Sequence, residues 1–111
     1  MREIPEADWK YMRRLKPALI DRLCERINQK TSALLKNPDL NAYERYLATF
    51  DNLNEENLNV ASAFDDWRRS TIFTRIMDIC RQEIFSEEEL QGFTQDTQDR
   101  IDACKPHKTN T

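Results

Sequence analysis

Glycine, histidine and long apolar runs are scarce in this chain, and each scarcity disfavours a class of function. The single glycine, Gly92, leaves no glycine-rich loop to cradle a phosphate. The single histidine, His107, has no neighbours that would orient a general base or a metal ligand. No stretch reaches the roughly 18 apolar residues of a membrane span. We therefore expect no catalytic residue, no cofactor, no metal site and no membrane contact.

Cysteine is also sparse. The three cysteines, Cys24, Cys80 and Cys104, are odd in number and far apart, and none belongs to a CxxC pair. This pattern indicates reduced thiols rather than a disulfide framework or a zinc site. The opening residues MREIPEADWK lack the apolar run of a secretory signal. Both observations predict a cytoplasmic protein.

Neither glycine nor proline occurs between Asp39 and Gln91, and few segments of the chain alternate with period two, so we predict an all-α fold. Apolar residues recur there every three or four positions, as on one face of a long amphipathic helix or a coiled-coil seam. They are Tyr43, Tyr46/Leu47, Phe50, Leu53, Val60/Ala61, Phe64 and Trp67. The net charge of −3 implies no general affinity for nucleic acid.

A helix is expected to begin after Pro5, where the acidic Glu6 and Asp8 suit the positive end of the helix dipole. Pro17 interrupts its pattern, because proline inside a helix removes a hydrogen bond at a cost of about 3 kcal/mol. The apolar stripe nevertheless continues beyond Pro17. We predict two collinear pieces, 6–15 and 17–36, that meet at a kink or a one-turn break.

The sequence Asn37-Pro38-Asp39 marks a stop and a restart, with Asp39 or Asn41 as the next cap. So short a connection makes the flanking helices antiparallel. If the turn centres there, facing residue numbers sum to about 77. The predicted facing pairs are Ile27 with Phe50, Cys24 with Leu53 and Ile20 with Asn57. Phe50→Ala would then cost about 3–5 kcal/mol, as truncation of a core aromatic does.

The charges of the two arms support this hairpin. Residues 1–36 carry nine Lys or Arg against five Asp or Glu, a net charge of +4. Residues 37–67 carry one against seven, a net charge of −6. Exposed ion pairs are each worth only about 0–1 kcal/mol, but complementary arms disfavour wrong pairings.

Residues 51–59 are the weak part of the second arm, because four Asn and one Asp disfavour a helix interior. Either the helix loosens or breaks near 51–56, or it continues and Asn57 is a buried polar residue that fixes the register. We favour a continuous helix, since the stripe keeps its phase on both sides.

Beyond Trp67, apolar residues surround segment 72–85 on more than one face, so more than one neighbour must cover it. Ser86 with Glu89 fits a capping box, Gly92 fits a helix stop, and Thr94 fits the cap of a last helix over 95–104. We predict one helical domain, 1–104, with one or two short C-terminal helices on the open end of the hairpin, and a flexible tail, 105–111.

The hairpin brings the strings WKYMRR (9–14) and DDWRRS (65–70) together at its open end. The candidate partner-binding residues, which we name the Trp/Arg cluster, are Trp9, Arg13, Arg14, Asp66, Trp67, Arg68 and Arg69. Arginine and tryptophan are over-represented in binding hot spots, and arginine grips carboxylate or phosphate through two hydrogen bonds. The alternative interpretation is structural, with these arginines paired to the nearby acids.

The segments IPEADWKYMRRLKPALIDRLCERIN (4–28) and FDDWRRS (64–70) resemble a group of short bacterial proteins of about this length. The resemblance covers most of the chain and implies a cytoplasmic bacterial protein. It supplies no activity, cofactor or site residue.

The leading functional hypothesis is a non-catalytic module that binds an unidentified protein partner through the Trp/Arg cluster or through a homodimer surface. Spare apolar surface around 72–85 suggests the homodimer. The alternative is a nucleic-acid- or ribosome-associated protein whose binding residues would be Arg13, Arg14, Arg68, Arg69, Arg75 and Arg81. A small enzyme would need an enclosed polar pocket near Cys24, Cys80 or the two tryptophans.

Overall fold

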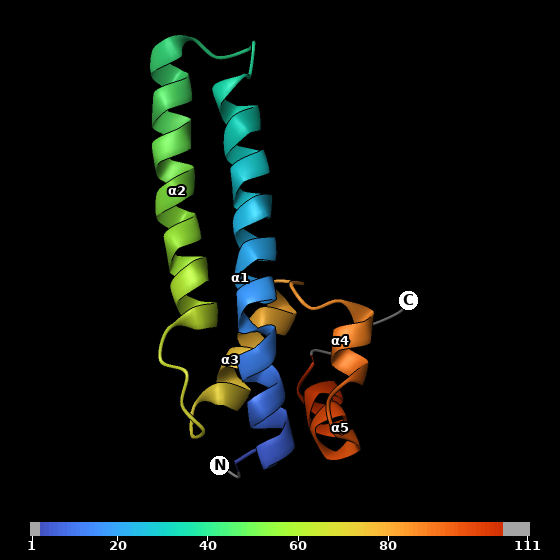
Figure 1. The fold of residues 1–111 in the computed structure, drawn as a ribbon. Helices are drawn as coiled ribbons and strands as arrows, with labels where there is room; N and C mark the ends of the chain where they lie inside the picture. Colours follow the sequence, from blue (N-terminus) through green and yellow to red (C-terminus); the bar gives the residue numbers. More distant parts are fainter. Residues whose placement is uncertain (1–2, 106–111) are drawn as a thin grey trace.

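The computed structural model describes residues 3–105, which form five helices and no strand (Figure 1). The helices are α1 (Glu6–Leu35), α2 (Ala42–Phe64), α3 (Ile72–Arg81), α4 (Glu87–Gln91) and α5 (Gln95–Cys104). α1 and α2 form a long antiparallel hairpin, and the three short helices gather at its open end, which confirms the predicted architecture. The molecule measures 51 × 37 × 24 Å. Residues 106–111, on which the expectation of a flexible tail rested, lie outside the described part.

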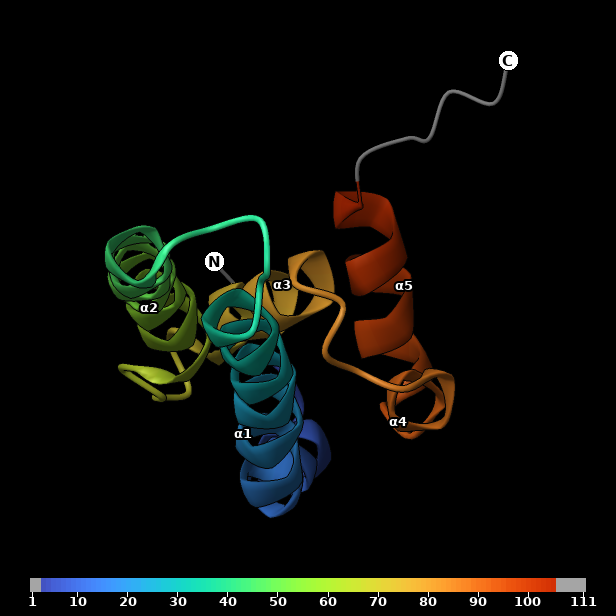
Figure 2. The same cartoon turned by 90° about the horizontal axis from the view of Figure 1, so that it is seen from above.

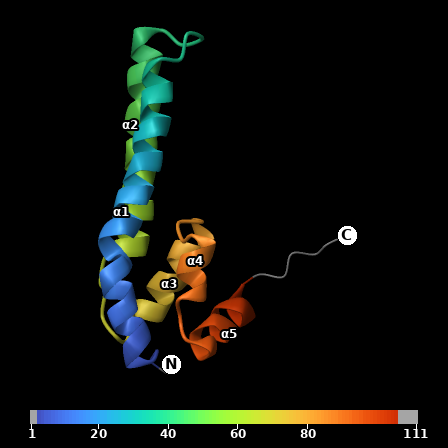
Figure 3. The same ribbon diagram turned by 45° about the vertical axis from the view of Figure 1, so that its right-hand side comes forward.

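α1 continues without a break from Glu6 to Leu35, with Pro17 inside it (Figure 3). The one-turn break that Pro17 allowed therefore does not occur. Met12 on one side of Pro17 and Leu19 on the other are both fully buried, so contacts on both sides hold the two halves together. This packing offsets the hydrogen bond that the proline removes.

The hairpin turn is held by side chains that bond to nearby backbone. The Asn37 side chain accepts from the N–H of Asp39 at 3.0 Å. Asn41 and Glu44 form a reciprocal capping box at the start of α2, with distances of 2.8 and 2.9 Å. Asn41 is thus the cap, one of the two residues expected there.

α2 runs through residues 51–59 without interruption, as we favoured. The buried polar residue is Asn52, however, whereas Asn57 is exposed, so the role expected of Asn57 and its facing with Ile20 are wrong. α2 also ends at Phe64, earlier than the apolar pattern suggested. Asp65 and Asp66 are not on the helix, and Asp66 has a φ of 57°. The Thr71 hydroxyl donates to the Asp66 carbonyl oxygen at 2.5 Å and accepts from the Arg68 N–H at 3.0 Å. These bonds close the 65–71 turn, in which an Asp takes the left-handed conformation more readily than most residues.

The apolar core lies at the open end of the hairpin, where α3 crosses beside α1 (Figure 2). Its buried residues are Ile4, Met12, Leu19, Leu23, Ile27, Ala63, Phe64, Ile72, Phe73, Ile76, Ile79, Ile84, Phe93 and Ile101. The core residues come from several elements and cover α3 on more than one face, as the apolar pattern of segment 72–85 predicted. The spare apolar surface predicted around 72–85 is therefore absent, and the homodimer cannot rest on it.

Two arginines of α1 fasten the segment between α3 and α4. Arg26 donates to the carbonyl oxygens of Gln82 and Glu83 at 2.6 and 2.8 Å. Arg22 donates to the carbonyl oxygen of Ile84 at 2.7 Å and to the Glu89 carboxylate at 2.6 Å. The Arg22 hydrogen bond lowers the pKa of Glu89. Cations at the end of a helix also meet its negative dipole, so this arrangement stabilises the end of α3.

Gly92 ends α4 as expected, but its φ of −77° needs no glycine. The requirement is space, because a Cβ at this position would stand 2.5 Å from Cζ of Tyr11. The Tyr11 hydroxyl passes over Gly92 to donate to the Glu89 carbonyl oxygen at 2.8 Å. Gly92 therefore allows α4 to dock on α1.

Asp8 has a larger role than the dipole interaction expected for it. Its carboxylate is buried and accepts from the Thr94 N–H at 2.9 Å, the Thr94 hydroxyl at 2.7 Å and the Thr97 hydroxyl at 2.5 Å. Thr94 is also the cap of α5, as predicted. One carboxylate in the first turn of α1 thus fixes the start of the last helix.

The distal half of the hairpin is packed differently. Between residues 28 and 62, all of which the structure describes, no apolar side chain is buried. α2 faces α1 there with its polar residues Arg45, Thr49, Asn52 and Glu56, of which Asn52 is buried. Thr49 Oγ1 and Asn52 Nδ2 are buried without a hydrogen-bond partner among residues 3–105. This seam is therefore a weak one.

Candidate protein-binding surface

The apolar stripe of α2, predicted to be the core seam, faces solvent instead. We use the name α2 apolar stripe for Tyr43, Tyr46, Leu47, Phe50, Leu53 and Leu58. Phe50 exposes 54% of its surface, Tyr43 68% and Leu58 73%. The predicted facing of Phe50 with Ile27 is therefore wrong, and so is the large cost assigned to Phe50→Ala.

The far end of α2 explains this orientation. Ala63, in the last turn, is fully buried, and Glu56 and Asn52 lie on the same face at spacings of seven and four residues. Phe50 precedes Asn52 by two residues and so lies about 200° around the helix. Because a straight helix turns as one body, anchoring Ala63 in the core directs Phe50 outward.

A shallow groove of about 400 Å³ follows one side of the stripe near the hairpin tip. It is lined by Leu35 of α1 and by α2 residues at helical spacing, which are Ala42, Arg45, Tyr46, Thr49, Phe50 and Leu53. The rings of Tyr46 and Phe50 stack in it at 6.4 Å between centroids. Figure 1 shows this part of the hairpin standing clear of α3, α4 and α5. A groove built in this way fits one face of another helix.

The two strings of the Trp/Arg cluster do come together at the open end. Arg69 forms an ion pair with Glu6, and the Lys16 ammonium lies 4.6 Å from the centroid of the Trp67 ring. Trp67 is half-buried, and its Nε1 donates to the Ala63 carbonyl oxygen at 2.9 Å. Trp67 therefore lies beside Lys16 of α1, where the chain turns after the end of α2 at Phe64.

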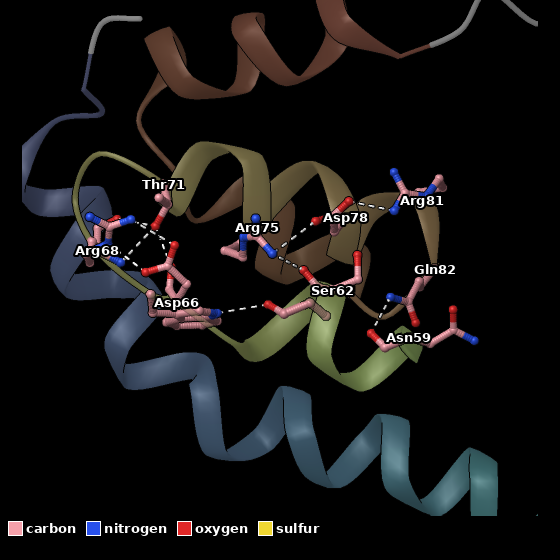
Figure 4. Close-up of polar contacts among 11 residues, drawn as sticks. Asn59, Ser62, Asp66, Arg68, Thr71, Arg75, Asp78, Arg81 and Gln82 are labelled. Carbon is pink, nitrogen blue, oxygen red and sulfur yellow. Dashed lines mark hydrogen bonds and ion pairs between the residues drawn. The ribbon is translucent and has the colours of Figure 1, made fainter. Parts of the chain in front are cut away.

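Four of the six arginines named for the nucleic-acid alternative have acidic partners within the protein, and Arg69, described above, is one of them. Arg68 binds the Asp66 carboxylate through two hydrogen bonds of 2.6 and 2.9 Å, and these lower the pKa of Asp66 (Figure 4). Arg75 and Arg81 both pair with Asp78, at 3.6 and 2.6 Å.

Arg13 and Arg14 are exposed as well, and among residues 3–105 they form no ion pair. They lie over the rings of Trp9 and Tyr11, at 6.0 and 5.7 Å from the centroids. The arginine-rich face on which a nucleic-acid function relied is thus reduced to these two residues, and the structural interpretation accounts for the others.

The cysteines are free thiols, with Cys24 and Cys80 half-buried and Cys104 exposed. Burial raises the pKa of the Cys80 thiol to about 11, so it stays protonated at neutral pH and is a poor nucleophile. Within residues 3–105, no three metal-binding side chains gather into a cluster. Over the same range, no helix combines the length and apolar character needed to cross a bilayer.

No protein-family model matches the chain, and searches of curated proteins and of solved structures also found no match. The arrangement of its own residues therefore carries the functional argument.

Proposed function

We propose that this protein is a non-catalytic helical interaction module that binds an amphipathic helix of a protein partner along the α2 apolar stripe. The observation that carries the proposal is the continuous exposure of large apolar residues from Tyr43 to Leu58. Exposed apolar patches of this kind mark interaction sites, because isolated proteins seldom leave them uncovered. From Tyr43 to Leu53, their three- and four-residue spacing matches that of a helical partner's own anchors.

The Trp/Arg cluster is the less favoured site for a partner. Its exposed cations Arg68 and Arg69 are held by Asp66 and Glu6, so binding another group would first require breaking these ion pairs. We also propose that the protein is cytoplasmic and bacterial. Its three cysteines are free thiols, as is usual for proteins of a reducing compartment.

Capture from the source cell, using the full chain as bait, tests this function. The comparison is between the wild type, Phe50→Glu on the stripe, and an Arg13→Ala/Arg14→Ala variant that removes the two exposed arginines of the Trp/Arg cluster that form no ion pair among residues 3–105. We expect a protein whose purified form binds directly to the wild type and to the arginine variant, and whose affinity for Phe50→Glu is lower by about 100-fold. Apolar contacts should also survive nuclease and raised salt.

The opposite pattern would overturn the proposal. If binding is unchanged by Phe50→Glu but is lost with nuclease treatment, raised salt or the arginine variant, then phosphate contacts carry it. The nucleic-acid alternative would then replace the helix-binding function.

A further inference from the structure

The α2 apolar stripe is nearly symmetric about its central residue, Phe50. Leu47 and Leu53 lie three residues to either side of it, and the stripe ends at Tyr43 and Leu58, seven and eight residues away. Reversing the direction of α2 about Phe50 thus places Phe50 on itself and Leu47 on Leu53, while Tyr43 and Tyr46 fall on Asn57 and Asn54. A surface with this property can pair with a copy of itself across a two-fold axis.

We propose that the helix bound by the stripe is α2 of a second copy of this chain, packed antiparallel across a two-fold axis near Phe50. This inference rests on the proposed function and names its partner. In this arrangement Phe50 meets Phe50 of the other copy. Leu47 of each copy shares a layer with Leu53 of the other, as alternating seam positions do in antiparallel helix pairs.

Charge does not oppose this pairing, although α2 is an acidic helix. The charged residues between Ala42 and Leu58 all lie about 100° or more around the helix from Phe50. They are Glu44, Arg45, Asp51, Glu55 and Glu56. The half of the helix that would face the second copy is therefore uncharged, and like charges do not meet at its centre.

The area is sufficient for a stable dimer. Taking about 150–250 Å² for a large side chain, the exposed parts of the stripe and of Leu35 amount to about 700 Å² in one copy and about 1,400 Å² in two. Stable specific interfaces bury about 1,200–2,000 Å² in total.

Sedimentation of the purified full chain over about two orders of magnitude in concentration tests the dimer. We expect the wild type to shift from the monomer mass of 13.2 kDa to twice that mass. Phe50→Glu places two carboxylates on the axis and should weaken association by about 100-fold. The control, Ala103→Glu, adds the same charge at an exposed position of α5, at the other end of the molecule, and should dimerise like the wild type.

Cysteine cross-linking tests the geometry. In a background with the three native cysteines replaced by serine, Leu47→Cys and Leu53→Cys chains are mixed and oxidised. Antiparallel pairing predicts that the 47–53 cross-link between copies forms faster than the 47–47 or 53–53 cross-link.

A monomer at every concentration, a dimer unaffected by Phe50→Glu, or a preference for 47–47 and 53–53 cross-links would overturn the inference. The proposed function fails separately. A chain that stays monomeric but binds another protein in a Phe50-dependent manner keeps the function and loses only the second copy as partner.

Discussion

Asp8→Ala is expected to lower the free energy of unfolding by about 3 kcal/mol, because three hydrogen bonds to one buried carboxylate are lost together. Asp8 exposes only 1% of its surface. Its removal leaves the Thr94 N–H and the Thr94 and Thr97 hydroxyls without their acceptor at the start of α5. Buried donors that lose an acceptor keep their desolvation cost, so the loss exceeds that of an ordinary surface contact.

Urea denaturation followed by circular dichroism measures this change. Glu6→Ala is the matched control, since Glu6 lies two residues earlier on the same helix and forms an exposed ion pair with Arg69. That variant should lose less than about 1 kcal/mol. If Asp8→Ala costs no more than Glu6→Ala, then Asp8 does not hold α5 in the way described.

Phe64→Ala is expected to cost about 3–5 kcal/mol, whereas Phe50→Ala should cost less than about 1 kcal/mol in the isolated monomer. Both residues belong to the same apolar pattern of α2. Phe64 is 7% exposed and packs against Trp67, with 6.0 Å between ring centroids. Phe50 points to solvent, so its removal leaves no cavity.

The comparison requires dilute protein, below the concentration at which copies associate. In a dimer, the loss of interface contacts would add to the measured cost of Phe50→Ala. Equal and large losses for the two variants would mean that Phe50 packs against α1 after all. The predicted facing of Phe50 with Ile27 would then be correct.

Local features of this fold were readable from the sequence. The Asn41 cap was one of two expected, the capping box of Ser86 with Glu89 involves residues three apart, and the turn at Pro38 is a short-range signal. Such features depend on neighbouring residues alone, so they survive whatever the tertiary packing is. The hairpin and the short C-terminal helices followed from them.

The direction of the α2 stripe was not readable in the same way. Periodicity shows that one face of a helix is apolar, but it does not show which element covers that face. Here the burial of Ala63 at the far end of α2 decides the rotation of the whole helix. The residues of the candidate surface other than Leu58 were therefore found in the sequence, but they were assigned to the core of the hairpin.

The role of Asp8 could not be predicted from the sequence, for a related reason. An acid in the first helical turn is already explained by the helix dipole, so nothing pointed to a further partner. Its partners Thr94 and Thr97 lie 86 and 89 residues away. The turn at Asp66 was missed because no glycine or proline marks it.

Hydroxyl-radical footprinting of the full chain across a range of protein concentrations tests the central claim most directly. The α2 apolar stripe should be open in the single chain and covered on association. We predict that Tyr43, Tyr46 and Phe50 are oxidised rapidly in dilute solution and become protected as concentration rises, while Phe64 stays protected throughout. Protection of Phe50 equal to that of Phe64 in dilute solution would contradict the account.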